Sequence, residues 1–215
     1  MPLNPGEITR AHCGVLFLDE LPEFARGTLE ALRQPLEEGS VELRRAHAGI
    51  QLPAKFQLIV AMNPCPCGML GHPTIPCRDT PKQVAAYRSR ISGPLLDRID
   101  IRLSLHAVDP SVFPEERDEG MTSSTIRQRV AELHALARER NGGCLNAALD
   151  ERVLRRQLAS KAKRLLLRNG KIDALSARSI LRILRVARSA ADIAGRDSID
   201  DEAIAQALHY RMRDS

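Results

Sequence analysis

The sequence predicts an α/β region followed by an all-α region. In the first half, uninterrupted apolar runs at 14–18 and 57–62 have the pattern of strands buried on both faces of a parallel sheet. In the second half, apolar residues recur every three or four positions, which is typical of amphipathic helices. The charge changes too: residues 1–120 carry 13 Lys and Arg against 16 Asp and Glu, net −3, whereas residues 121–215 carry 19 against 11, net +8. Two regions that differ in predicted secondary structure and in net charge therefore follow one another.

Three further elements are expected in the first half. A helix over 28–38 should be shortened or kinked by Pro35 and should end at Gly39. A β-hairpin should follow over 41–53. Alternating apolar residues from Ile99 to Leu105 predict a third strand.

A linker is predicted at 109–121, a stretch that contains two prolines, several acidic residues and a glycine. The first domain would then be residues 1–108 and the second residues 122–215. Helices in the second domain are expected to begin at Thr122, Asp150, Ser176 and Asp200, with Ile126, Val130, Leu133 and Ala137 forming the apolar stripe of the first.

The composition excludes several classes of protein. With 43% hydrophobic and 27% charged residues, the chain can form a folded core and is not disordered. No apolar run approaches the roughly 18 residues of a membrane span, and the start has no signal-peptide core, so a cytoplasmic protein with no membrane partner is expected. The chain has only six Phe and Tyr and no Trp, so contacts with a nucleic acid should be mostly to phosphates.

Two acids, Asp19 and Glu20, directly follow the first predicted strand. This is the pattern of a Walker B motif, in which the first acid holds Mg²⁺ through water and the second polarises the attacking water. Acids after a strand are also common loop residues. Asn63 follows the second strand, where an amide could orient a water against a γ-phosphate, and Arg98 precedes the third, where a guanidinium could reach a neighbour's phosphate. Taken singly, Asn63 would be a turn residue and Arg98 the ion-pair partner of a nearby aspartate.

Four segments together resemble the magnesium-chelatase-like AAA+ ATPases of the ComM/YifB competence-protein type: GVLFLDELPEF, AMNPCPCG, SGPLLDRID and LSARSILRILRVARSAADIAG. The resemblance implies a partial AAA+ core, with a truncated parallel sheet, followed by a helical lid. It makes Asp19 and Glu20 the Walker B pair, Asn63 sensor 1, Arg98 the arginine finger and Arg178 the sensor 2 arginine.

The resemblance also implies partners. Members of this type assemble as hexameric rings, use ATP and Mg²⁺, and act as DNA helicases that extend branches during natural transformation. The hairpin that carries Arg44, Arg45 and His47 matches an insertion that faces the pore and touches DNA.

The family's phosphate-binding loop, G-x-x-x-x-G-K-[ST], does not occur in this chain. Its only Gly-Lys pair, Gly170-Lys171, is followed by Ile172. Because that loop supplies the backbone amides and the lysine that hold the phosphates, we expect residues 1–215 alone to have negligible ATP affinity and no ATPase turnover. The sequence therefore looks like the C-terminal part of a longer protein.

Three cysteines lie within thirteen residues: Cys65, Cys67 and Cys77. The family has a second C-x-C here, and Asp79 stands at the position of its last cysteine. Zinc accepts carboxylate and imidazole, so Asp79 or His72 could complete a structural zinc site with four protein ligands. The alternative is three reduced surface thiols.

Three functions stay open at this point. The first is a fragment of a ring-forming DNA motor. The second is a catalytically inactive module that binds DNA or partner subunits, for which the basic run Lys161, Lys163, Arg164 and Arg168 could supply phosphate contacts. The third is a magnesium chelatase motor subunit, against which the CPCG segment argues.

Overall fold

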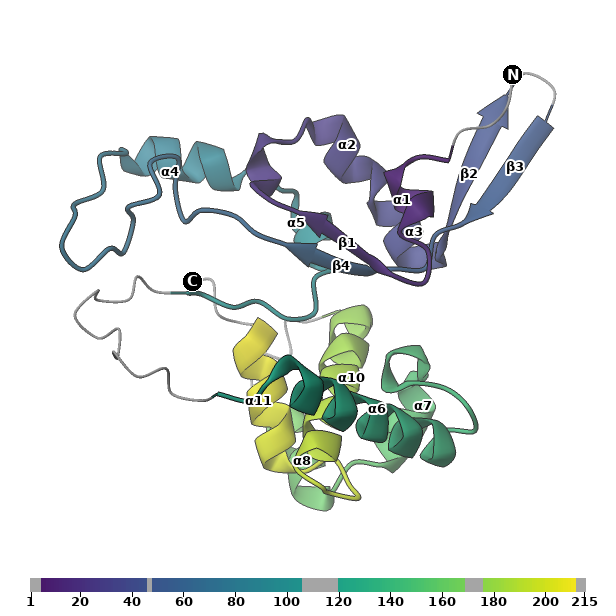
Figure 1. Ribbon diagram of the computed structural model, residues 1–215. Helices are drawn as coiled ribbons and strands as arrows, with labels where there is room; N and C mark the ends of the chain where they lie inside the picture. The colour runs from purple at the N-terminus through teal and green to yellow at the C-terminus, as the bar shows by residue number, and fades with distance from the viewer. Residues whose placement is uncertain (1–4, 46–47, 106–119, 169–175, 212–215) are drawn as a thin grey trace. The chain divides into compact units, whose positions relative to one another are not determined.

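The computed structural model describes residues 5–45, 48–105, 120–168 and 176–211 (Figure 1). The chain forms two compact units, Met1–Ile99 and Asp100–Ser215. The first combines short strands with helices, and the second is helical. The predicted order, an α/β region followed by an all-α region, is confirmed.

A short parallel sheet lies in the first unit. Its strands are β1 (Val15–Leu18) and β4 (Gln57–Val60), paired so that Phe17 lies opposite Ile59. Both strands were predicted from their apolar runs. Because the strands are parallel, the loops that follow Leu18 and Val60 leave the sheet at the same edge.

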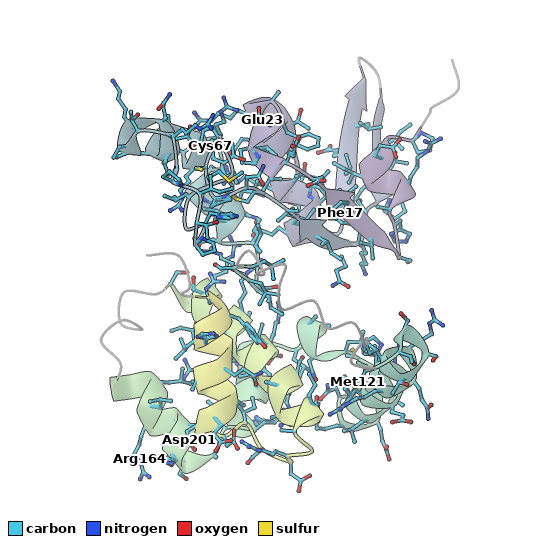
Figure 2. The ribbon with its side chains drawn as sticks, turned by 60° about the vertical axis from the view of Figure 1, so that its left-hand side comes forward. Phe17, Glu23, Cys67, Met121, Arg164 and Asp201 are labelled. Carbon is cyan, nitrogen blue, oxygen red and sulfur yellow. The ribbon has the colours of Figure 1, made fainter. Side chains whose placement is uncertain are left out.

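The prediction that these strands are buried on both faces is wrong. Leu16, Leu18 and Val60 pack against the core of the unit, whereas Phe17 is 58% exposed and Ile59 44% (Phe17 is labelled in Figure 2). Side chains alternate between the two faces of a strand, so a helical layer on one face buries only every second residue.

The predicted third strand is also wrong, because residues 99–105 form no strand. Leu103 is 63% exposed and Leu105 93%. The backbone N–H of Arg102 donates to the carbonyl of Tyr210 at 2.8 Å, at the end of a helix. Apolar alternation specifies a strand only where a neighbouring strand offers a ladder of hydrogen bonds, and this segment contacts a helix end instead.

Short helices cover one face of the sheet, around a core of Leu21, Leu29, Leu32, Ile91 and Leu95. The helix predicted over 28–38 is divided at Leu32, since Pro35 has no N–H to continue the hydrogen bonding. The helical elements of the unit are α1 (Glu7–Arg10), η1 (Leu21–Glu23), α2 (Arg26–Ala31), α3 (Arg33–Glu38), α4 (Pro81–Arg88) and α5 (Gly93–Leu96).

The predicted hairpin is confirmed. Strands β2 (Ser40–Arg45) and β3 (Ala48–Pro53) pair antiparallel, and Gly39 leads into β2 from the end of α3, as expected. Gly39 has φ +67°, a left-handed conformation that favours glycine, and a Cβ there would lie 2.8 Å from Cγ of Lys55.

Gly39→Ala should therefore destabilise the hairpin by about 1–2 kcal/mol. The measurement is amide hydrogen exchange of β2 and β3 in the whole chain, which reports the free energy of local opening. Gly27→Ala is the matched control: Gly27 lies inside α2 with nothing within 4 Å of the added Cβ. It should leave stability unchanged or raise it by up to about 1 kcal/mol. Equal effects of both changes would contradict the prediction.

The second unit is a helical bundle with a core that includes Leu154, Ile183, Leu184, Ile199 and Ile204. The predicted N-caps are confirmed: the side chains of Thr122, Asp150 and Ser176 each accept a backbone hydrogen bond from the first turn. The elements are α6 (Ser123–Arg140), η3 (Asn146–Ala148), α7 (Glu151–Arg156), α8 (Ser160–Arg168), α10 (Ala177–Ile193) and α11 (Asp201–Arg211).

The apolar stripe of α6 is only partly buried. Ala137 is 3% exposed, but Ile126 is 46% and Val130 43% exposed. Near its C-terminal end, Arg140 bonds to Asp192 of α10. In the second turn, Arg129 donates to the carbonyl of Ile193 of α10 at 3.1 Å. Periodicity predicted the helix correctly, but the apolar side chains of its first two turns stay largely exposed among the described residues. None of the described helices is long and apolar enough to cross a membrane.

Candidate functional site

Asp19 and Glu20 lie at the carboxyl end of β1, both exposed. Glu20 has φ 49° and ψ 48°, a left-handed conformation that is uncommon outside glycine, and its N–H donates to Oδ1 of Asp19 at 2.9 Å. The N–H of Leu21 then donates to the carbonyl of Ala61 at 3.0 Å, which ties this turn to the end of β4. The sharp turn keeps two adjacent carboxylates at the edge of the sheet, an arrangement suited to a hydrated divalent cation.

Asn63 leaves the sheet at the same edge, three residues after the end of β4, and is exposed. The phenol of Tyr87, from α4, lies next to it. Burial raises the pKa of Tyr87, the negative charges of Glu23 and Glu20 raise it further, and a hydrogen bond from the backbone of Asn63 opposes them. Tyr87 is therefore near both the acidic turn and Asn63. Sequence reasoning missed it, although it is one of two tyrosines in the chain.

Arg98 follows α5 and is held inside its own unit. Its guanidinium bonds to the carboxylate of Glu37, and Nη1 donates to the carbonyl of Pro94 at 2.6 Å. The Arg98 side chain is 9% exposed. Sequence reasoning offered an aspartate beside Arg98 as the alternative partner, whereas Glu37 comes from α3, 61 residues away.

The other residues predicted to meet a nucleotide or DNA belong to α10 and to the hairpin. Arg178 is in the first turn of α10, in the second unit, and is exposed. Arg44 and Arg45 are the last residues of β2. His47 lies outside the described residues.

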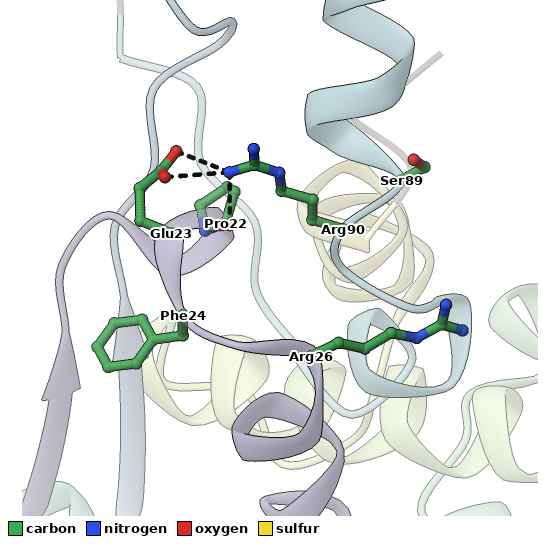
Figure 3. Close-up of a pocket in the computed structure, with 6 residues that line it drawn as sticks. All are labelled: Pro22, Glu23, Phe24, Arg26, Ser89 and Arg90. Carbon is green, nitrogen blue, oxygen red and sulfur yellow. Dashed lines mark hydrogen bonds and ion pairs between the residues drawn. The ribbon is translucent and has the colours of Figure 1, made fainter.

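A shallow pocket of about 400 Å³ opens beside the acidic turn and is lined by Pro22, Glu23, Phe24, Arg26, Ser89 and Arg90 (Figure 3). Arg90 dominates it. Nη1 of Arg90 donates to both carboxylate oxygens of Glu23, at 3.1 and 3.0 Å, and to the carbonyl of Pro22 at 3.2 Å. The segment after α4 is thereby fixed to the η1 turn that follows Glu20.

The three clustered cysteines converge with Asp79. The Sγ atoms of Cys65, Cys67 and Cys77 are 3.5–3.6 Å apart, too far for a disulfide. Cys67 is labelled in Figure 2. A tetrahedron with metal–sulfur bonds of about 2.3 Å has edges of about 3.8 Å, close to this triangle. Oδ2 of Asp79 lies 3.8 Å from Sγ of Cys77, and the four ligand atoms lie within 4.8 Å of one another. These residues fit a tetrahedral zinc site.

The Asp79 carboxylate also accepts hydrogen bonds from this group of cysteines. Hydrogen bonds from the thiol and from the backbone N–H of Cys67, the latter at 2.8 Å, lower the pKa of Asp79 below its ordinary value. The pKa of the Cys77 thiol is raised to about 11: a hydrogen bond from the backbone of Asp79 lowers it, but burial and the neighbouring Cys67 and Cys65 raise it more.

His72 is not part of the cluster. Its Nδ1 accepts the backbone N–H groups of Thr74 at 3.2 Å and Ile75 at 3.1 Å, so this nitrogen closes a turn. Of the two candidate fourth ligands, the structure brings Asp79 to the thiols. The sequence left this choice open because a loop of this length could fold to present either residue.

Comparisons with known proteins agree with the resemblance read from the motifs. Residues 1–112 match the family described as magnesium chelatase, subunit ChlI, and residues 120–211 match the family described as its C-terminal part. Competence protein ComM of Haemophilus influenzae is 41% identical over 97% of this chain. The uncharacterised protein YifB of Salmonella typhimurium and that of Escherichia coli are each 42% identical over 98%.

The chain spans only part of these relatives. The match covers 41% of the length of ComM, 41% of the Salmonella protein and 42% of the Escherichia coli protein. The two family matches together extend over both units described above. The chain belongs to the magnesium chelatase subunit ChlI family, in which it is similar to the ComM and YifB proteins.

Proposed function

We propose that this chain is part of a ring-forming AAA+ ATPase that remodels branched DNA. The observation that carries the proposal is that Asp19 and Glu20 follow β1 while Asn63 follows β4, so that all three leave the parallel sheet at the same edge. In this proposal Asp19 holds Mg²⁺ through water, Glu20 polarises the attacking water and Asn63 orients it against the γ-phosphate of ATP.

The remaining roles follow from the family. Arg98 would act as an arginine finger on the nucleotide of a neighbouring subunit in a hexamer, which requires it to exchange Glu37 for a phosphate. Residues 122–215 would form the lid of the core domain 1–108, across a linker at 109–121, and Arg178 would contact the nucleotide.

The proposal of DNA as the substrate rests on charge and on the relatives. The second half of the chain carries a net charge of +8, which favours contact with phosphates. Arg44, Arg45 and His47 would add contacts from the hairpin. The relative ComM is named a competence protein, which is consistent with a role in DNA uptake and recombination.

The test is a chimera in which the phosphate-loop part of a ComM relative precedes residue 5. It should hydrolyse ATP, and branched DNA should stimulate the turnover. Residues 1–215 alone are the control and should show no turnover. A folded chimera that binds ATP and DNA but does not hydrolyse ATP would overturn the ATPase proposal and favour the inactive binding module.

We also propose that Cys65, Cys67, Cys77 and Asp79 hold one Zn²⁺. The near-equilateral triangle of thiols with a carboxylate beside it supports this. Four protein ligands leave no open coordination position, so the metal would be structural.

Protein purified without added metal should contain one zinc per chain by elemental analysis. Cys67→Ser should abolish binding. Asp79→Ala should weaken binding by more than the roughly 10- to 100-fold typical of losing an outer-shell partner. His72→Ala and Cys144→Ser should both retain the metal, since His72 is not in the cluster and Cys144 is an exposed cysteine of the second unit. Metal-free wild-type protein with three freely titratable thiols would contradict the proposal.

A further inference from the structure

The metal cluster is connected to Asn63 by a very short and stiff piece of chain. Only Pro64 separates Asn63 from Cys65, which is completely buried. The ring of Pro64 fixes its own φ, and it restricts the residue before it to extended conformations. Few backbone dihedral angles between the buried Cys65 and the backbone of Asn63 can therefore rotate freely.

The other side of the cluster leads into α4. Asp79 is followed by Thr80, the N-cap of this helix. Thr80 and Gln83 form a capping box: Oγ1 of Thr80 accepts the N–H of Gln83 at 3.3 Å, and Oε1 of Gln83 accepts the N–H of Thr80 at 2.8 Å. The start of α4 is thus fixed one residue after a proposed ligand.

The far end of α4 returns to the loop from which the cluster begins. Nε of Arg88 donates to the carbonyl of Pro64 at 3.3 Å. The side chain of Tyr87, one residue earlier in α4, is 6% exposed. Arg90, two residues after the end of α4, bonds to Glu23 and Pro22, which follow Glu20 (Figure 3). The C-terminal end of α4 and the two residues after it therefore contact the loops that follow both strands.

These contacts form a closed ring: Pro64, the cluster, α4, and back through Arg88 to the carbonyl of Pro64, which follows Asn63. No helix or strand lies between Val60 and Pro81. Without a metal, the two halves of the cluster are joined by the bond from the N–H of Cys67 to Asp79 and by weak S–H hydrogen bonds between the thiols. We propose that a metal bound by the cluster fixes the position of Asn63, and that Arg88 is the positioning residue through which the end of α4 holds the carbonyl of Pro64, next to Asn63. This inference rests on the proposed zinc site.

The experiment compares amide exchange of residues 1–215 by NMR, with one equivalent of Zn²⁺ and after its removal by a chelator. Zinc should slow exchange of the Asn63 amide and of the C-terminal turn of α4 by about tenfold or more. Amides of α10, in the other unit, should not respond. Elemental analysis of the same samples measures zinc content.

Arg88→Met isolates the positioning role, because it keeps the aliphatic part of an exposed side chain and removes the Nε–H that bonds to Pro64. It should retain one zinc per chain and lose the zinc-dependent protection of Asn63. Lys82→Met, at an exposed cation in the first turn of α4, is the matched control and should behave as the wild type.

Three outcomes separate the two proposals. If zinc binds but protects only residues 65–79, the inference is overturned while the metal site stands. If Asn63 keeps full protection in Arg88→Met, the role of Arg88 is overturned. If no zinc binds at all, the metal site fails and the inference fails with it.

Discussion

In the ATP-hydrolysing chimera, Glu20→Gln is expected to reduce turnover about 10²–10⁴-fold while leaving nucleotide affinity unchanged. The amide has nearly the shape of the carboxylate but cannot accept a proton from the attacking water. The left-handed turn at Glu20, tied to Ala61, keeps this side chain at the sheet edge next to Asp19. The backbone around the site should therefore be the same in the variant.

Phosphate release measures the turnover, and a fluorescent nucleotide measures binding. Glu7→Gln is the matched control, because Glu7 is an exposed acid of α1 whose side chain pairs only with Arg10 among the ion pairs of the described residues. It should leave turnover unchanged. Wild-type turnover in Glu20→Gln would remove Glu20 from the catalytic site.

Asp192→Ala is expected to destabilise the second unit by about 3–5 kcal/mol. Asp192 accepts hydrogen bonds from Arg140 at 2.8 Å, Arg188 at 2.9 Å and Asn146 at 2.7 Å. The Arg188 side chain is 0% exposed and that of Asp192 3%. Removing the carboxylate leaves a buried guanidinium without its counter-charge, and that penalty exceeds the net contribution of the pair itself.

Urea unfolding followed by far-ultraviolet circular dichroism gives the free energy of unfolding. Asp201→Ala is the control, because Asp201 pairs with a Lys161 side chain that is 72% exposed, and it should cost about 1 kcal/mol or less. A similar small loss in Asp192→Ala would contradict the prediction.

The Asp192 carboxylate also makes the stability of the second unit depend on pH in the acidic range. Burial alone would raise the pKa of Asp192, but hydrogen bonds from Arg140 and Asn146 and the charges of Arg188 and Arg140 lower it overall from 3.8. A lowered folded-state pKa contributes stability that is present above pH 3.8 and is lost as the pH falls through the folded value. Asp192→Asn should remove this part of the pH dependence.

The sequence by itself determined much of the local structure and the motifs. Apolar runs predicted β1 and β4, periodicity predicted α6 and α10, and the caps Thr122 and Ser176 marked where those helices begin. These features depend on neighbours within a few residues, so a single sequence records them. The motifs also pointed to the family, because Asp19-Glu20 and the CPCG segment are local as well.

Only the tertiary structure decided which residues meet over long distances. It excluded a strand at 99–105, exposed one face of the sheet, and paired Arg98 with Glu37, 61 residues away. It placed Asp79 rather than His72 at the thiols and brought Tyr87 back to Asn63. Each of these outcomes depends on how distant segments pack, and that packing leaves no periodic or adjacent pattern in the sequence.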